Sequence, residues 1–170
     1  MDDLKTPKIL KPTAYMLIGP PGCGKSTWAH KHAHLWHTHA SSDKYIDLIA
    51  SKEGKSYGEV FKTAIDPATK MFNIELHDAI ETRRNIVIDR TNTAPKARRQ
   101  ILADLKEAGY TTVAVVFDVS AEVCLARQDK RVGKPIPRNV FDSMMKTHVD
   151  NNIPSAKLHS EFDQVITVRD

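Results

Sequence analysis

Eight consecutive residues, from Gly19 to Ser26, constrain the fold of this chain more than any other feature of its sequence. They read Gly-Pro-Pro-Gly-Cys-Gly-Lys-Ser and satisfy the pattern G-x-x-x-x-G-K-[ST] in full. An apolar run over residues 14–18 precedes them, and residues 27–36, which contain no proline or glycine, follow them. This order of strand, glycine-rich turn and helix is the context in which the motif forms a phosphate-binding loop. The sequence therefore predicts a strand at 14–18 and a helix from the loop to about residue 36.

The residues of this loop suit the binding of a nucleoside triphosphate. Glycines let several backbone N–H groups point into one concavity that binds anionic oxygens, and the helix N-terminus adds the positive end of its dipole. Lys25 is expected to reach the β- and γ-phosphates, and the Ser26 hydroxyl is expected to hold Mg²⁺. The predicted nucleotide-binding residues of this segment are Gly19, Pro20, Pro21, Gly22, Cys23, Gly24, Lys25, Ser26 and Thr27.

The composition is that of a soluble globular protein. The 170 residues suffice for one domain, and 41% of them are apolar while 27% are charged. No apolar run approaches the roughly 18–20 residues of a transmembrane helix, and the N-terminus lacks the pattern of a signal peptide. Two cysteines are too few for a disulfide framework, so we expect reduced thiols, a cytoplasmic location and no membrane partner. The net charge of +4 suits a polyanionic partner without requiring one.

Short apolar strands alternate with helices along the rest of the chain. We expect further strands near residues 38–41, 86–88, 112–117 and 164–168, and helices over about 44–50, 66–83, 95–108, from 121 onward and over 139–151. Asp66 is expected to be the N-cap of the second of these helices, and Pro67 its first residue. The alternation predicts a single α/β domain over residues 1–170, with a central parallel sheet covered by helices on both faces.

Two segments are expected to stand apart from this sheet. Residues 1–13 are polar and form a lead-in to the first strand. Residues 128–138 are rich in charge and contain Gly133, Pro135 and Pro137, which favours a small basic lid. In a parallel α/β sheet the ligand lies at the carboxyl ends of the strands, and every chemically suggestive residue of this chain follows a predicted strand end.

Four motifs, taken together, resemble the kinase domain of phage polynucleotide kinase. They are the phosphate loop extended to Ala29, Ser42-Asp43-Lys44-Tyr45, Asp89-Arg90-Thr91-Asn92 and Arg127-Gln128-Asp129-Lys130-Arg131. They occur in that family's order and at similar spacing, and the resemblance covers about residues 13–150. It implies an adenylate-kinase-like P-loop fold that uses ATP and Mg²⁺ to phosphorylate a 5′-hydroxyl end of DNA or RNA. The phosphatase motif D-x-D-G-T is absent, so a separate phosphatase or ligase partner remains open.

The resemblance also implies roles for individual residues. Asp43 matches the general base, and we favour this role over the alternative, in which Asp43 only caps the turn that follows. Arg127 and Arg131, four residues apart, match the lid arginines that hold the nucleotide and neutralise the transferring phosphoryl group. The alternative for this arginine pair is an ordinary solvated helix face. With Lys25, Asp43 and Arg131 form the expected catalytic set.

The segment after the third predicted strand carries the rest of the expected site. Asp89 is placed like an acid linked to Mg²⁺ through water, and Ser26 would be its partner at the metal. Thr91 and Asn92 match an acceptor-side pair, with a polar turn before the next helix as the alternative. Arg90 stands where the phage enzyme has an acid, and we expect it to supply charge to the acceptor.

One departure from the family concerns the acceptor. Ile46 occupies the position at which the phage enzyme carries an arginine that grips the acceptor phosphate. A kinase of a nucleoside, a small metabolite or a hydroxymethylated base in DNA is therefore the first alternative. A nucleic-acid-binding module that uses ATP only as a switch is the second. Histidines 30, 34 and 37 share a predicted helical face at metal-ligand spacing, but no carboxylate partner is evident for a zinc site.

Overall fold

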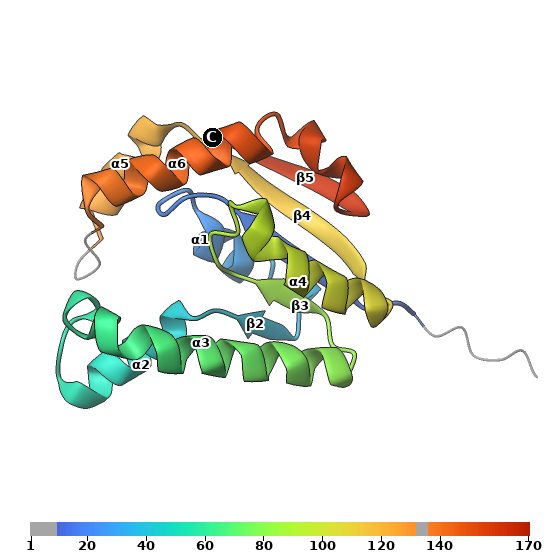
Figure 1. The fold of residues 1–170 in the computed structure, drawn as a ribbon, viewed down its shortest axis with the longest axis horizontal. Helices are drawn as coiled ribbons and strands as arrows, with labels where there is room; N and C mark the ends of the chain where they lie inside the picture. The colour runs from blue at the N-terminus through green and yellow to red at the C-terminus, as the bar shows by residue number, and fades with distance from the viewer. Residues whose placement is uncertain (1–9, 132–135) are drawn as a thin grey trace, which may run out of the picture.

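A computed structural model describes residues 10–131 and 136–170 of this chain. Within these residues five strands form one parallel sheet in the order β2-β3-β1-β4-β5 (Figure 1). The strands are β1 (Thr13–Ile18), β2 (Thr38–Ala40), β3 (Ile86–Ile88), β4 (Thr111–Asp118) and β5 (Gln164–Arg169). Strand β1 pairs with β3 on one side and β4 on the other, which places the phosphate loop at the centre of the sheet. The predicted α/β class with a central parallel sheet is confirmed.

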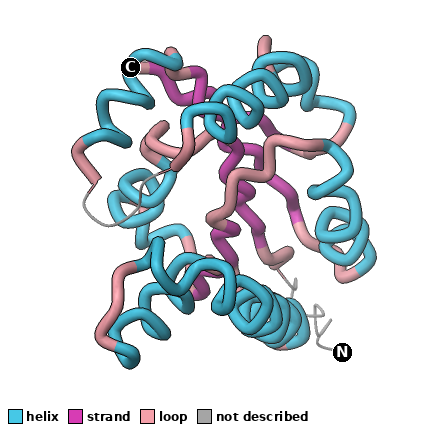
Figure 2. The backbone as a smooth tube through the Cα atoms, turned by 60° about the vertical axis from the view of Figure 1, so that its left-hand side comes forward, coloured by secondary structure: helices cyan, strands magenta, loops and turns pink. Residues whose placement is uncertain are grey.

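Helices cover both faces of this sheet, and the strands lie between them in Figure 2. The helices are α1 (Lys25–Lys31), α2 (Asp43–Glu53), α3 (Tyr57–Glu81), α4 (Pro95–Glu107), α5 (Ala121–Asp129), α6 (Arg138–Asn152) and the 3₁₀-helices η1 (Ala33–Leu35) and η2 (Ser155–Ser160). One face packs against α3, α4 and η2, and the other packs against α1, α5 and α6. None of the helices in the described ranges is long and apolar enough to cross a membrane.

Strand β1 shows why the sequence reads as a continuous apolar run. Met16 and Ile18 belong to the core on one face of the sheet, whereas Leu17 belongs to the core on the other. All three side chains are at most 1% exposed. Because successive residues of a strand point to opposite faces, a sheet that is covered on both faces requires apolar side chains at every position.

Helix α3 begins earlier than the sequence predicts. We expected its N-terminus at Asp66, but Ser56 caps the helix by accepting a hydrogen bond from the backbone N–H of Glu59, whose side chain accepts one from the backbone of Ser56 in return. Pro67 therefore lies inside the helix. The prediction was wrong because the buried residues Val60, Ala64 and Ala68 pack against Ile46 and Ala50 of α2 and stabilise the early turns.

Helix α1, by contrast, ends earlier than predicted. It stops at Lys31 instead of near residue 36, and the 3₁₀-helix η1 follows. The indole N–H of Trp36 then donates a hydrogen bond of 3.0 Å to the carbonyl of Ala29, which turns the chain back toward β2. Histidines 30, 34 and 37 therefore do not share one helical face.

The two segments that were expected to stand apart are only partly described. Of the predicted lead-in, residues 1–9 lie outside the described residues. Of the predicted lid, residues 128 and 129 belong to α5, Arg138 begins α6, and residues 132–135 lie outside the described residues. The C-terminal end of α5 and the N-terminal end of α6 lie on the side of the molecule where the α2–α3 connection also lies (Figure 1).

Candidate active site

The phosphate loop connects β1 to α1 with backbone angles that favour glycine. Gly22 and Gly24 have φ values of 82° and 104°, in the left-handed region. A Cβ atom on Gly22 would lie 2.4 Å from the carbonyl oxygen of Cys124 in α5. The backbone N–H of Gly19 donates a hydrogen bond of 3.0 Å to the carbonyl of Thr91, so the loop after β3 supports the start of the phosphate loop.

Lys25 lies against the loop to which it belongs. Its ammonium group donates hydrogen bonds of 2.9 Å to the carbonyl oxygens of Gly19 and Pro20. Burial raises the pKa of the neighbouring Cys23 thiol, although the charge of Lys25 and its hydrogen bond act in the opposite direction. Cys23 is therefore a neutral thiol that packs within the loop, and a neutral thiol is a poor nucleophile. The ammonium group is in place to meet phosphate oxygens bound by the loop.

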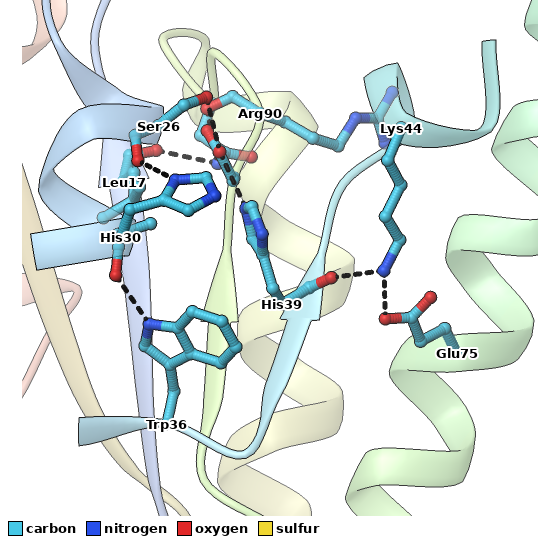
Figure 3. A network of polar contacts seen from close by, with 11 residues as sticks. Leu17, Ser26, His30, Trp36, His39, Lys44, Glu75 and Arg90 are labelled. Carbon is cyan, nitrogen blue, oxygen red and sulfur yellow. Dashed lines mark hydrogen bonds and ion pairs between the residues drawn. The ribbon is translucent and has the colours of Figure 1, made fainter. Parts of the chain in front are cut away.

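Ser26, Asp89 and His39 form a polar network below the loop (Figure 3). The Ser26 hydroxyl donates a hydrogen bond of 2.9 Å to Oδ2 of Asp89, and His39 Nε2 lies 2.8 Å from the same oxygen. Because an ionised carboxylate can only accept, His39 Nε2 carries the proton in this pair. Burial alone would raise the pKa of Asp89, but the His39 hydrogen bond, the charge of Lys25 and the Ser26 hydrogen bond together lower it. Asp89 is thus an anion although its side chain is only 4% exposed.

The residues present fit a magnesium ion bound together with a nucleotide. Ser26 and Asp89 supply a hydroxyl and a carboxylate oxygen, the ligand types that Mg²⁺ prefers, and they already lie within hydrogen-bond distance of each other. Mg²⁺ usually keeps several waters and takes further ligands from substrate phosphates, so a pair of protein oxygens is sufficient. Sequence reasoning identified these two residues but missed His39, whose imidazole becomes adjacent to them only when β2 and β3 pair.

Lys44, the residue after the expected base, anchors α2 to the sheet and to α3. Its ammonium group donates hydrogen bonds of 2.6 Å to the carbonyl of His39 and to the carboxylate of Glu75 (Figure 3). The neighbouring Tyr45 also donates a hydrogen bond from its hydroxyl to Glu75. The bond from Lys44 to the His39 carbonyl fixes the start of α2, and therefore Asp43, relative to β2.

Asp43 and Arg90, which follow β2 and β3, interact electrostatically. Asp43 is the exposed first residue of α2, and Arg90 follows β3 with its guanidinium 4.8 Å from the ring centre of Phe72. Burial lowers the pKa of Arg90, whereas the negative charge of Asp43 raises it. Arg90 stays charged at neutral pH, because the guanidinium group does not lose its proton in proteins. The side chain extends from the end of β3 toward the start of α2 (Figure 3).

Ile46, Thr91 and Asn92 are placed differently from Arg90. Ile46 is 0% exposed and packs between α2 and α3. The carbonyl of Thr91 binds the phosphate loop, and Asn92, which is 6% exposed, donates hydrogen bonds to the carbonyls of Leu17 and Arg90. Asn92 has a φ of 50°, so the pair forms the polar turn that the sequence offered as the alternative to substrate binding.

The two expected lid arginines occupy different positions. Arg127, in α5, donates a hydrogen bond of 3.3 Å to the carbonyl of Cys23 and forms an ion pair of 2.8 Å with Asp170. Arg131 follows the end of α5, so the two arginines do not share one helical face. Arg131 is exposed and exerts an electrostatic effect on Tyr57 at the start of α3. One arginine therefore lies at the loop, and the other acts electrostatically on the start of α3.

A pocket beside the phosphate loop has a volume of about 330 Å³. A volume of this order suits a small organic ligand. Its lining residues are Cys23, Gly24, Thr27, Trp28, Lys31, Phe117, Arg127, Val168 and Asp170. Sequence reasoning did not assign five of these residues to the site: Trp28 and Lys31 of α1, Phe117 of β4, and Val168 and Asp170 at the end of β5. Their proximity depends on the sheet order.

Solved structures with similar folds include several kinases and protein complexes. A chain of the PezAT chromosomal toxin–antitoxin system of Streptococcus pneumoniae is 14% identical, with a TM-score of 0.70 over 94% of this chain and 67% of that one. A chain of the Pnkp1/Rnl/Hen1 RNA repair complex is 20% identical, with a TM-score of 0.66 over 92% of this chain and 49% of that one. Shikimate kinase from Acinetobacter baumannii, solved with shikimate, is 16% identical, with a TM-score of 0.57 over 94% of this chain and 85% of that one.

At these identities the likeness concerns the fold, which is that of the P-loop kinases, and it does not single out phage polynucleotide kinase. The chain spans about half the length of the RNA-repair chain, so it corresponds to part of that protein. The family model described as the AAA domain matches residues 15–150, which include the phosphate loop, the Asp43 and Asp89 segments and both lid arginines. Because this match covers well over half of the sequence, the chain belongs to the AAA domain family.

Proposed function

We propose that this chain is an ATP-dependent kinase that phosphorylates the 5′-hydroxyl end of a polynucleotide, DNA or RNA. The observation that carries the proposal is the placement of Asp43 and Arg90. Asp43 begins α2, Arg90 follows β3, and the two interact electrostatically beyond the carboxyl ends of neighbouring strands, beside the strand that leads into the phosphate loop. A carboxylate there can accept a proton from an alcohol, and a half-buried cation can hold an anionic acceptor. A switch-type ATP-binding module would need neither group.

The donor side of the proposed reaction is formed by the phosphate loop and α5. The amides of Gly22 and Gly24 would hold the phosphates, and Lys25 would exchange its hydrogen bonds to Gly19 and Pro20 for bonds to the phosphates. Arg127 would contact the nucleotide in the adjacent pocket. Ser26 and Asp89 would hold Mg²⁺, which would offset the negative charge of the phosphates.

The chemical step requires one proton acceptor and one source of positive charge. Asp43 would take the proton of the acceptor hydroxyl while the oxygen of that hydroxyl bonds to the γ-phosphorus and the bond from phosphorus to the ADP oxygen breaks. Arg131 would lie over the transferring group and stabilise its charge, as arginines do in other phosphoryl transfers. Catalysis by these residues is mainly positioning and charge stabilisation.

A kinase that acts on a nucleoside, a small metabolite or a hydroxymethylated base in DNA is the second candidate. The observation in its favour is Ile46, which is fully buried and leaves α2 without the arginine of the phage enzyme. Arg90, with Thr91 beside it, would then bind a different anionic or polar acceptor. The presence of shikimate kinase among the structural neighbours is compatible with this alternative.

Transfer of labelled γ-phosphate from ATP to a 5′-hydroxyl oligonucleotide tests the proposal directly. We expect transfer by the wild type, a loss of at least about 100-fold in kcat for Asp43→Asn, and an unchanged rate for Asp150→Asn. Asp150 is an exposed carboxylate near the end of α6 whose partner is Lys146, so it controls for the loss of a negative charge. Transfer to a nucleoside or metabolite panel but not to the oligonucleotide would favour the second candidate.

The partners follow from the substrate. The nucleic acid end is the proposed partner at the acceptor side, and a separate phosphatase or ligase would complete a repair reaction. The RNA-repair and toxin–antitoxin neighbours are themselves parts of protein complexes, which is compatible with such a partner.

A further inference from the structure

Tyr57, the first residue of α3, has no role in the site predicted from the sequence, yet it contacts the expected base. Its hydroxyl donates a hydrogen bond of 2.7 Å to Oδ1 of Asp43. The bond connects the first residues of two successive helices. Tyr57 is half-buried whereas Asp43 is exposed. The tyrosine thus holds one oxygen of a surface carboxylate that would otherwise rotate freely.

The position of the Tyr57 ring depends on features other than Asp43. The capping box of Ser56 and Glu59 determines where α3 begins. The ring packs against the apolar cluster that joins α2 to α3, and its centre lies 5.7 Å from that of Phe61. Because packing and the helix start locate the ring, the hydroxyl is held in place before any acceptor binds.

The charges around Tyr57 keep its hydroxyl protonated. Burial, then the hydrogen bond to Asp43 and the charge of that carboxylate, raise the pKa of Tyr57 far above its usual value, whereas Arg131 has a smaller opposing effect. The hydroxyl is therefore a permanent donor at neutral pH. It donates to the expected base, and the exposed Arg131 acts on it electrostatically.

We propose that Tyr57 is a positioning residue of the phosphoryl-transfer site, whose hydroxyl orients the Asp43 carboxylate toward the acceptor hydroxyl. This inference rests on the function proposed above. Tyr57 touches no reacting atom and acts only through Asp43. An oriented carboxylate reaches the acceptor proton without a search through rotamers, and such preorganisation is a recognised source of rate enhancement.

Tyr57→Phe tests this role, because it removes the hydroxyl and keeps the ring against Phe61. We expect kcat for transfer to the oligonucleotide to fall about ten-fold, with the KM for ATP within about two-fold of wild type. Tyr45→Phe is the matched control. Tyr45 belongs to the same apolar cluster, but its hydroxyl bonds to Glu75 instead of Asp43, so we expect its kcat to stay near that of the wild type.

A second measurement separates positioning from a general structural role. Combined with Asp43→Asn, the Tyr57→Phe change should lower kcat no further, because the residue through which it acts is already altered. An equal fall in both backgrounds, or an unchanged kcat in Tyr57→Phe alone, would overturn the proposal. A lower melting temperature accompanied by an unchanged kcat would also overturn it.

The readout also distinguishes failure of this inference from failure of the proposed function. If the wild type phosphorylates no oligonucleotide but hydrolyses ATP, the proposed acceptor is wrong. The wild type, Asp43→Asn, Tyr57→Phe and the double variant are then compared by their rates of ATP hydrolysis, with water as the acceptor. The same ten-fold fall and the same lack of additivity would then support the positioning role. A wild type that turns over no ATP with any acceptor would overturn both proposals.

Discussion

At the scale of single residues, the proposed acceptor site depends on which residue supplies its positive charge. Ile46 is fully buried between α2 and α3, so α2 offers no side chain at that position to an acceptor. Arg90 instead reaches toward Asp43 from the end of β3 while its guanidinium stacks on Phe72. The cation that could hold an acceptor therefore follows β3, whereas the family resemblance implies a cation on α2.

We expect Arg90→Ala to raise the KM for the oligonucleotide acceptor about ten-fold and to leave the KM for ATP unchanged, because a charge-assisted contact would be lost only on the acceptor side. Steady-state kinetics with each substrate varied in turn measures both constants. Arg99→Ala, which removes an exposed arginine of α4, is the control. An unaltered acceptor KM in Arg90→Ala would show that this arginine does not hold the acceptor.

The role of His39 also depends on a contact with a residue that is distant in the sequence, Asp89. His39 donates to the same Asp89 oxygen that accepts from Ser26, and partners of this kind orient carboxylates toward metals. We expect His39→Ala to raise the Mg²⁺ concentration needed for half-maximal nucleotide binding by about ten-fold. Calorimetric titration of ATP at several Mg²⁺ concentrations measures this without turnover. His77→Ala, in which an exposed histidine of α3 is lost, should match the wild type; equal behaviour of both variants would contradict the role of His39.

At the scale of secondary-structure elements, α3 shows packing overriding a local signal. Pro67 lacks a backbone N–H and its ring crowds the carbonyl of Thr63, so it normally marks the start of a helix. Here the helix continues through it, because residues on both sides of Pro67 pack against α2 and the sheet. Pro67 is exposed, so burial of its ring contributes little to the stability of the protein.

Pro67→Ala should therefore stabilise the protein. We expect the free energy of unfolding to rise by roughly 2 kcal/mol, because the helix regains a hydrogen bond, partly offset by a more flexible unfolded chain. Urea unfolding followed by circular dichroism measures the change. Lys70→Ala, one turn further along α3 and also exposed, is the control. A variant that is no more stable than the wild type would mean that α3 already accommodates the proline without cost.

Helix α6 carries a buried histidine that connects it to the central sheet. His148 is 1% exposed, its Nε2 donates a hydrogen bond of 2.8 Å to the carbonyl of Phe117, and its Nδ1 accepts one from Asn152. This pairing suits the neutral ring. Burial lowers the pKa of His148, with the Phe117 hydrogen bond acting in the opposite direction.

The sign of the resulting pH dependence follows from this lowered pKa. Below the ordinary histidine value of about 6.5 the unfolded chain binds a proton that the folded chain resists, so acid favours unfolding. We expect the His148 contribution to stability to be fully present above neutral pH and to decline as the pH falls below that value. Thermal unfolding between pH 5 and 8 measures it. His148→Gln should show a flatter profile than the wild type, whereas the profile of His159→Gln, an exposed-histidine control, should run parallel to it.

At the scale of the whole molecule, Arg98 joins three segments behind the site. It is 0% exposed and donates hydrogen bonds to the carbonyls of Asn92 and Thr93, to the side chain of Asn152 and to the carboxylate of Glu161. It thereby ties the loop after β3 to α6 and to the end of η2. The same loop supports the phosphate loop through Thr91, so the stability of the site depends on residues distant in sequence.

Arg98→Lys should lower the free energy of unfolding by about 3 kcal/mol, because an ammonium group cannot reproduce the planar set of donors and leaves buried acceptors unpaired. Chemical denaturation measures the loss. Arg99→Lys, the neighbouring exposed residue, should change stability little. A loss of less than about 1 kcal/mol in Arg98→Lys would mean that water or rearranged side chains satisfy these acceptors.

Much of this molecule could be predicted from local sequence. The phosphate loop motif with its flanking strand and helix, and the apolar runs at β3, β4 and β5, each depend on residues close together in the chain. The same holds for the parallel α/β class, since strands that alternate with helices allow few other arrangements. The start of α3 was missed because a proline signal competed with a capping box and with packing against α2.

By itself, the sequence determined that the loop from Gly19 to Ser26 would meet phosphates and that Asp43, Asp89 and Arg90 would follow strand ends. Only the tertiary structure decided which of these residues meet. The strand order brings His39 to Asp89, and the packing of α2 on α3 buries Ile46 while it presents Tyr57 to Asp43. The physical reason is range: glycine geometry, helix caps and apolar periodicity act between neighbours, whereas hydrogen bonds between distant residues form only after the core has packed.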